Sequence, residues 1–146
     1  MIGKIIKAGF LSSIVGMIVF YIFADLLGNQ IILKEFYLLE PTIWRHPNLL
    51  SRNIGRLAKY FGVFILTNTL WAYVYSVRES TINGLGFQKG IKFFFLFWLL
   101  TIPLHFWFWV MIKYPVEILI YNVFVTHLFL FAAVGGVIGK ICSSNK

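Results

Sequence analysis

Charged residues are scarce in this sequence. Only 12% of its 146 residues are Asp, Glu, Lys or Arg, whereas 60% are hydrophobic and 19% are aromatic. Soluble domains carry about 25% charged residues. In water, a chain of this size could not bury so much apolar surface on itself. The composition therefore excludes an ordinary soluble domain and predicts one domain, residues 1–146, embedded in a bilayer.

Acidic residues and cysteine are rarer still. Five Asp and Glu stand against 13 Lys and Arg, which gives a formal net charge of +8. The basic residues lie at the ends of the hydrophobic runs and do not form a basic arm. We therefore expect them to face anionic lipid headgroups and not nucleic acid. The single cysteine, Cys142, excludes an intrachain disulfide.

Sequence motifs of enzymes and cofactor sites are missing. C-x-x-C, H-E-x-x-H and the Walker glycine-lysine loop do not occur, and G-L-G at 84–86 is only a fragment of a phosphate-binding pattern. We therefore expect no enzymatic activity, no bound cofactor and no metal ion.

Long apolar runs are what the sequence does contain. A spanning helix needs about 20 mostly apolar residues, and its backbone must be paired internally because lipid offers no partner. The runs do not alternate as barrel strands would. The sequence thus predicts an all-α integral membrane four-helix bundle with spans at about 8–28, 57–77, 90–112 and 115–139.

The connections between these spans differ in length. Only Lys113 and Tyr114 separate the last two, and Pro115 suits a first helical turn because its missing amide would be unpaired there. These two spans are predicted to form a tight antiparallel hairpin. The segment 29–56 contains Pro41 and Pro47 and is predicted to be an interfacial loop.

Charge placement suggests an orientation. Lys4 and Lys7 precede the first span, and basic residues are favoured on the cytoplasmic side. An even number of spans puts both termini on that side, so we expect both in the cytoplasm. Four of the five acids fall on the other side: Asp25, Glu35, Glu40 and Glu117.

Polar residues inside the spans are the candidates for function, because they are costly in lipid. Asp25 is either an ion-binding or proton-binding carboxylate, or an interfacial partner of Lys59 or Arg56, and the second interpretation is favoured. Asn68 is expected to hydrogen-bond between helices, with a substrate site as the alternative.

Pro103 and His105 interrupt the third span. Pro103 is predicted to kink the helix. Counted from the hairpin, His105 and Asn122 lie at one depth, so a hydrogen bond between them is predicted, directly or through a water. The same count separates His105 and His127 by about 7 Å in height, which disfavours the two as axial ligands of one haem.

Small residues crowd the end of the last span. Gly135 and Gly139 form G-x-x-x-G, and Gly136 repeats the spacing with Ala132. Such residues let two helix backbones approach closely. This end is therefore expected to pack against protein, either within the chain or in a dimer.

The succession AYVYS, NGLGFQKGIKF, a proline in the third span and a glycine-rich final span resembles a broad group of small uncharacterised bacterial four-span inner-membrane proteins. The resemblance implies the four-span architecture in a bacterial inner membrane. It implies no activity.

Two classes of function fit these features. The first is a binding, assembly or accessory subunit without enzymatic activity, in a homo-oligomer or with a membrane-protein partner. The alternative is a component of a transporter or channel for protons or a small solute, active as an oligomer. Its path would be lined by Asp25, Asn68, His105 and Asn122.

Overall fold

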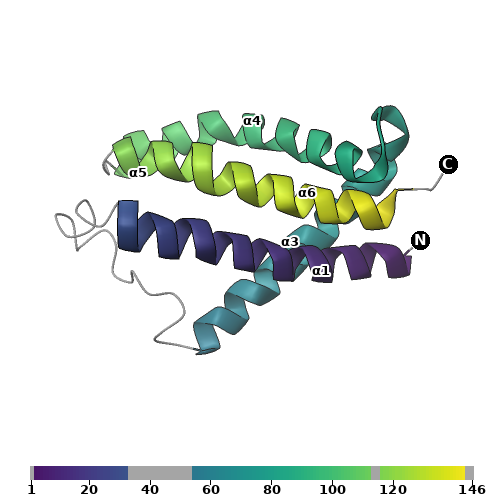
Figure 1. Cartoon of the computed structure of the whole chain (residues 1–146), viewed down its shortest axis with the longest axis horizontal. Helices are drawn as coiled ribbons and strands as arrows, with labels where there is room; N and C mark the ends of the chain where they lie inside the picture. Colours follow the sequence, from purple (N-terminus) through teal and green to yellow (C-terminus); the bar gives the residue numbers. More distant parts are fainter. Residues whose placement is uncertain (1, 33–53, 113–115, 144–146) are drawn as a thin grey trace.

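The computed structural model describes residues 2–32, 54–112 and 116–143 (Figure 1). These residues contain no strand and form four long helices, so the all-α prediction is confirmed. Two of the long helices are continuous through turns of the wider π type. In chain order the elements are α1 (Ile2–Phe20), η1 (Tyr21–Ile32), α3 (Ile54–Arg78), η2 (Glu79–Thr81), α4 (Gly86–Ile112), α5 (Val116–Tyr121), η3 (Asn122–His127) and α6 (Leu128–Cys142).

Three helical stretches in the described residues are long and apolar enough to cross a membrane: Ile2–Gly28, Gly86–Trp107 and Val116–Cys142. Their mean hydropathy is 2.1, 1.5 and 2.0, respectively. The 25-residue helix α3 covers the second predicted span but is not among them. The polar run Thr67, Asn68 and Thr69 lowers its hydropathy.

Glycines bring α4 and α6 into backbone contact. A Cβ atom added to Gly90 would meet the Gly135 carbonyl oxygen and lie 2.7 Å from the Gly139 Cα atom. A Cβ on Gly139 would meet the Gly86 carbonyl oxygen. Gly86 and Gly90 thus form a second G-x-x-x-G, and it faces the predicted one. This glycine contact lies within one chain. The sequence alone had not decided between a contact within the chain and a contact in a dimer.

The packing of Gly136 is different, because its open side faces an aromatic ring. A Cβ there would meet the Phe87 ring of α4. All three glycines of α6 are therefore covered by the chain's own α4.

Small residues also line the buried face of α1. A Cβ on Gly9 would lie 2.7 Å from the Thr69 Cα atom of α3, and one on Gly16 would lie 3.1 Å from Val134 of α6. Figure 1 shows α3 crossing α1 at an angle, with its first turns pointing away from the other helices. This face of α1 holds α3 and α6 together through Ala8, Gly9, Ser12, Ser13 and Gly16, all of them buried.

A hydrophobic core lies where all four long helices meet. Phe93 and Phe94 of α4 pack there with Tyr75 of α3, and the ring centroids of Tyr75 and Phe93 are 5.4 Å apart. The buried residues of this core are Ile5, Ala8, Ala72, Tyr75, Phe93, Phe94, Val134 and Ile138.

The helix ends differ from the predicted ones. The first helix begins at Ile2, and the last ends at Cys142. Gly84, with φ 128°, makes the turn before α4, so that helix begins at Gly86, earlier than expected. The backbone stays helical through Pro103.

Both ends of the described chain lie at the same end of the bundle (Figure 1). The Cys142 Sγ atom is 4.0 Å from the Lys4 carbonyl oxygen. The predicted hairpin turn at 113–115 and most of the predicted interfacial loop, residues 33–53, lie outside the described residues.

Candidate functional site

Two unusual features of the helices lie near each other: Pro103 inside α4, where the backbone stays α-helical, and the π-helical turn η3. In a π-helix the amide bonds the carbonyl five residues back, and such turns are frequent at functional sites. Trp98 of α4 reaches η3, where its Nε1–H donates to the Val123 carbonyl at 2.7 Å. The indole thus links α4 to the π-helical turn η3.

Two imidazoles lie in tilted contact beside this link. The ring centroids of His105, on α4, and His127, at the end of η3, are 4.6 Å apart, and the ring planes are inclined by 57°. Both side chains are half-buried. His105 and His127 are called the histidine pair below.

Each imidazole of the histidine pair is held by its own helix. The Nδ1 atom of His105 lies 2.7 Å from the Thr101 carbonyl oxygen, and that of His127 lies 2.8 Å from the Asn122 carbonyl oxygen. A carbonyl oxygen only accepts hydrogen bonds, so both Nδ1 atoms carry the proton and donate it. The tautomer of both rings is thereby fixed, and in the neutral rings Nε2 carries the lone pair.

The rings of the two histidines lie closer together than the height difference of about 7 Å counted along the helix axes suggests. Side chains tilt toward the N-terminus of their own helix. Because α4 begins near the end of α6 (Figure 1), the tilts of His105 and His127 oppose each other. His127 leans toward the start of the last helix. His105 leans toward the start of α4, which is the opposite direction, so the two rings approach each other and most of the gap of about 7 Å counted along the axes is closed.

The predicted direct hydrogen bond between His105 and Asn122 is not formed. His105 bonds within its own helix instead, and the Asn122 Oδ1 atom accepts from Thr126 Oγ1 at 3.4 Å. Asn122 does bind a histidine through its main-chain carbonyl, but the histidine is His127. A contact between His105 and Asn122 through a water, which the sequence analysis also allowed, stays a prediction.

A second polar contact joins α1 and α3. The Asn68 Nδ2 atom donates to Ser13 Oγ at 3.1 Å, and Ser13 Oγ donates to the Gly9 carbonyl at 2.6 Å. Asn68 is 6% exposed and Ser13 is fully buried. The Asn68 carboxamide therefore forms a hydrogen bond between two helices, as the sequence analysis expected.

Next to Asn68 lies a cavity of about 190 Å³ between α3, α4 and α6. Thr67 and Asn68 are its polar lining, and the rest is apolar or aromatic. The lining includes Phe64, Trp71, Phe94 and Leu130. A lining of this kind suits a hydrocarbon chain better than a polar solute or an ion.

The described part of the structure contains no contact between the side chains of Asp25 and Lys59. The backbone of Asp25 lies in η1, but its side chain and that of Arg56 lie outside the described residues. Lys59 is exposed. The predicted pairing of Asp25 therefore stays a prediction.

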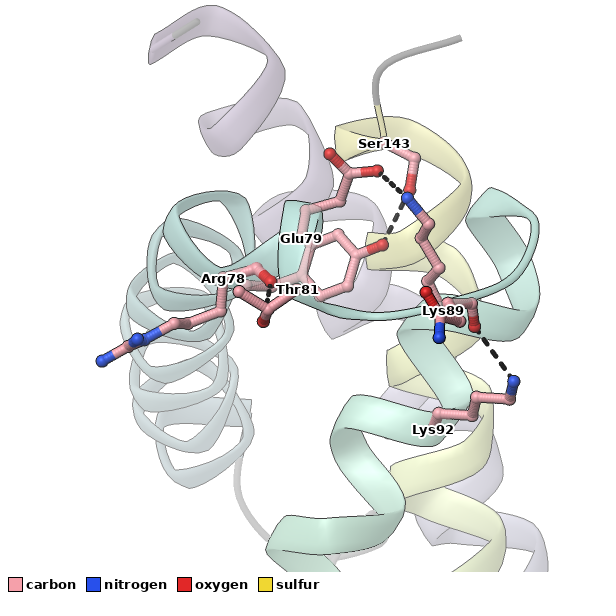
Figure 2. Close-up of polar contacts among 8 residues, drawn as sticks. Arg78, Glu79, Thr81, Lys89, Lys92 and Ser143 are labelled. Carbon is pink, nitrogen blue, oxygen red and sulfur yellow. Dashed lines mark hydrogen bonds and ion pairs between the residues drawn. The ribbon is translucent and has the colours of Figure 1, made fainter. Parts of the chain in front are cut away.

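A third polar group, shown in Figure 2, closes the end of the bundle where the termini lie. Lys89 Nζ at the start of α4 binds the Glu79 carboxylate of η2 at 2.6 Å. Tyr75 Oη of α3 and Ser143 Oγ, just past α6, are 2.7 Å apart. The cluster connects three helices and was missed by sequence reasoning, which treated 78–90 only as a turn.

No group of three or more His, Cys, Asp or Glu side chains that could hold a metal ion is found in residues 2–32, 54–112 and 116–143. Comparison with known proteins adds no relative: no protein-family model, no curated protein and no solved structure matches this chain.

Proposed function

We propose that this chain is a non-enzymatic accessory or assembly subunit of a bacterial inner membrane. In this proposal all four long helices span the bilayer, α4 and the last helix form an antiparallel hairpin, and both termini are cytoplasmic. Three helices with spanning character support the membrane location, and Lys4 and Lys7 at the start of α1 support the orientation.

The observation that carries the proposal is the uncovered face of α3. Its large side chains recur every three or four residues, and each is at least half exposed. They form a single stripe along the helix, because that spacing keeps residues on one face. The α3 stripe consists of Tyr60, Val63, Leu66, Leu70, Tyr73 and Val77.

A partner protein suits the α3 stripe better than lipid does. Of the four long helices α3 is the least apolar, yet it leaves a full face uncovered. Exposed Gly62 and Thr67 lie among the stripe residues, and a Cβ on Gly62 would meet nothing. Small and hydroxyl-bearing residues are typical of contacts between membrane helices.

The inner polar groups support accessory function over transport. Asn68 is bonded to Ser13, and both histidines of the pair are bonded to carbonyls of their own helices. A transport path needs polar groups that are open to a substrate. Asn68 and Ser13 thus serve the contact between α1 and α3, and the cavity beside Asn68 is lined mainly by apolar and aromatic side chains.

Photocrosslinking in native membranes tests this proposal. A photoreactive amino acid at Leu66 or Leu70 should give one adduct with the same membrane protein, identified by mass spectrometry and by reciprocal crosslinking from that protein. Leu100 of α4, which is 72% exposed, is the matched control and should give lipid adducts only. An adduct of twice the chain mass would identify the partner as a second copy.

Two results would count against the accessory role. One is lipid adducts alone at Leu66, Leu70 and Leu100. The other is a proton flux through the purified chain in liposomes that Asp25→Asn abolishes while the protein stays folded, which would support the transporter alternative.

A further inference from the structure

The histidine pair is not explained by an accessory role. Packing alone would be satisfied by apolar side chains, and an imidazole in lipid is costly when one nitrogen lacks a partner. In the described part of the chain, each ring forms a hydrogen bond through Nδ1 and none through its other nitrogen. Both Nε2 atoms are therefore free to take a ligand.

The hydrogen bonds at Nδ1 are those that metal-binding histidines make. A ligating histidine usually donates its second ring N–H to a carboxylate, carbonyl or water, which fixes the tautomer and the ring orientation. His105 and His127 both donate to main-chain carbonyls, at 2.7 and 2.8 Å. Each ring is thus oriented before any ligand arrives.

We propose that His105 and His127 bind a copper ion through their two Nε2 atoms. A metal–nitrogen bond of about 2.0 Å puts the ring centroid about 3.1 Å from the metal. With both Nε2 atoms bound to one metal, centroids 4.6 Å apart would subtend roughly 95° at that metal. The pair thus occupies adjacent corners of a coordination sphere, whereas the axial ligands of a haem must face each other across the iron.

The number and angle of these ligands select copper. Imidazole suits zinc, copper, iron and nickel, and a bite near a right angle matches the square-planar preference of Cu²⁺, which also heads the stability order. A structural zinc site takes four protein ligands, and no cluster of three His, Cys, Asp or Glu is found in the described residues. The remaining positions on the copper are open to an external ligand.

Access to the site is short. His105 lies seven residues before Ile112, the last residue of α4, so it is about 10 Å from that end of the helix. Both histidines are half-buried, not enclosed. The pair is therefore separated from the aqueous side opposite the termini by about a third of the hydrocarbon thickness of about 30 Å.

Copper titration of the purified full-length protein tests the site. The protein carries a histidine-free affinity tag at its C-terminus, its α-amino group is blocked by acetylation so that it cannot compete as a ligand, and Cu²⁺ alone is added in mild detergent. Electron paramagnetic resonance should show one copper per chain with splitting from two nitrogens. His105→Gln and His127→Gln should each lose the two-nitrogen pattern and weaken binding by at least about tenfold.

His46 provides the matched control, because it is the only other histidine in the chain. His46→Gln should bind copper as the unaltered protein does. The proposal is overturned if the unaltered protein shows no coupled nitrogen pair, or if the signal depends on His46. If a glutamine variant misfolds, judged by gel filtration, the nitrogen count in the unaltered protein still decides. Copper binding is independent of the proposed accessory role, which crosslinking at α3 and proton flux in liposomes test.

Discussion

Gly90→Ala is expected to give the largest loss of stability of any single methyl group added to this chain. The new Cβ would lie 2.7 Å from the Gly139 Cα atom and 2.8 Å from its nitrogen, and closer still to the Gly135 carbonyl oxygen. All three neighbours are backbone atoms, so no side chain can rotate away and α4 must move off α6. Overpacking of this kind costs about 1–3 kcal/mol and sometimes more.

Gly62→Ala is the control for Gly90→Ala, since it makes the same chemical change inside a helix. A Cβ on Gly62 meets nothing within 4 Å. Alanine is a better helix former than glycine by about 0.5–1 kcal/mol, so this variant should be as stable as the original protein or more so. Unfolding of both variants in detergent measures the difference. Equal stability of the two would contradict the close backbone contact between α4 and α6.

Lys89→Met is expected to give the second largest loss. It removes the cation that lies 2.6 Å from the Glu79 carboxylate, and that carboxylate side chain is only 11% exposed. A hydrogen bond to a charged group contributes about 1.5–3 kcal/mol. Methionine keeps most of the apolar stem, so the free energy of unfolding should fall by roughly 2–3 kcal/mol through the lost charge.

Lys92→Met serves as the comparison for Lys89→Met. Lys92 is exposed and donates only to the Asn83 carbonyl, at 3.0 Å, so its loss should change stability by no more than about 0.5 kcal/mol. The double variant with Glu79→Gln and Lys89→Met should lose less than the sum of the two single variants, because they share one interaction. Additive losses would show that the ion pair contributes nothing of its own.

The four helices were predictable because length and apolarity decide them. Runs of about 20 apolar residues leave the backbone few choices in lipid, whatever the neighbouring helices do. The exact ends were not predictable in this way. The start of α4 at Gly86 depends on the positive φ of Gly84 and on Gly86 fitting against Gly139 across the interface.

The candidate site was only partly predictable. Sequence spacing marked His105 and Asn122 as polar groups inside the helices, and the structure describes both beside the segment where α4 meets η3. The π-helical turn at Asn122–His127 carries no signal in a single sequence, because packing against α4 decides it. The meeting of His105 and His127 could have been inferred from the tilt of side chains along their helices.

Reporter fusions after Trp44 and Asn83 test most directly whether the chain is a four-span membrane protein. The crossing of α3 is the critical point, because this helix lacks the apolarity of the other three. If α3 crosses, the two fusion points lie on opposite sides of the membrane, whatever the orientation of the chain. A reporter that is active only outside the cytoplasm should be active after Trp44 and inactive after Asn83 and after Lys146. The same activity after Trp44 and Asn83 would contradict the four-span account.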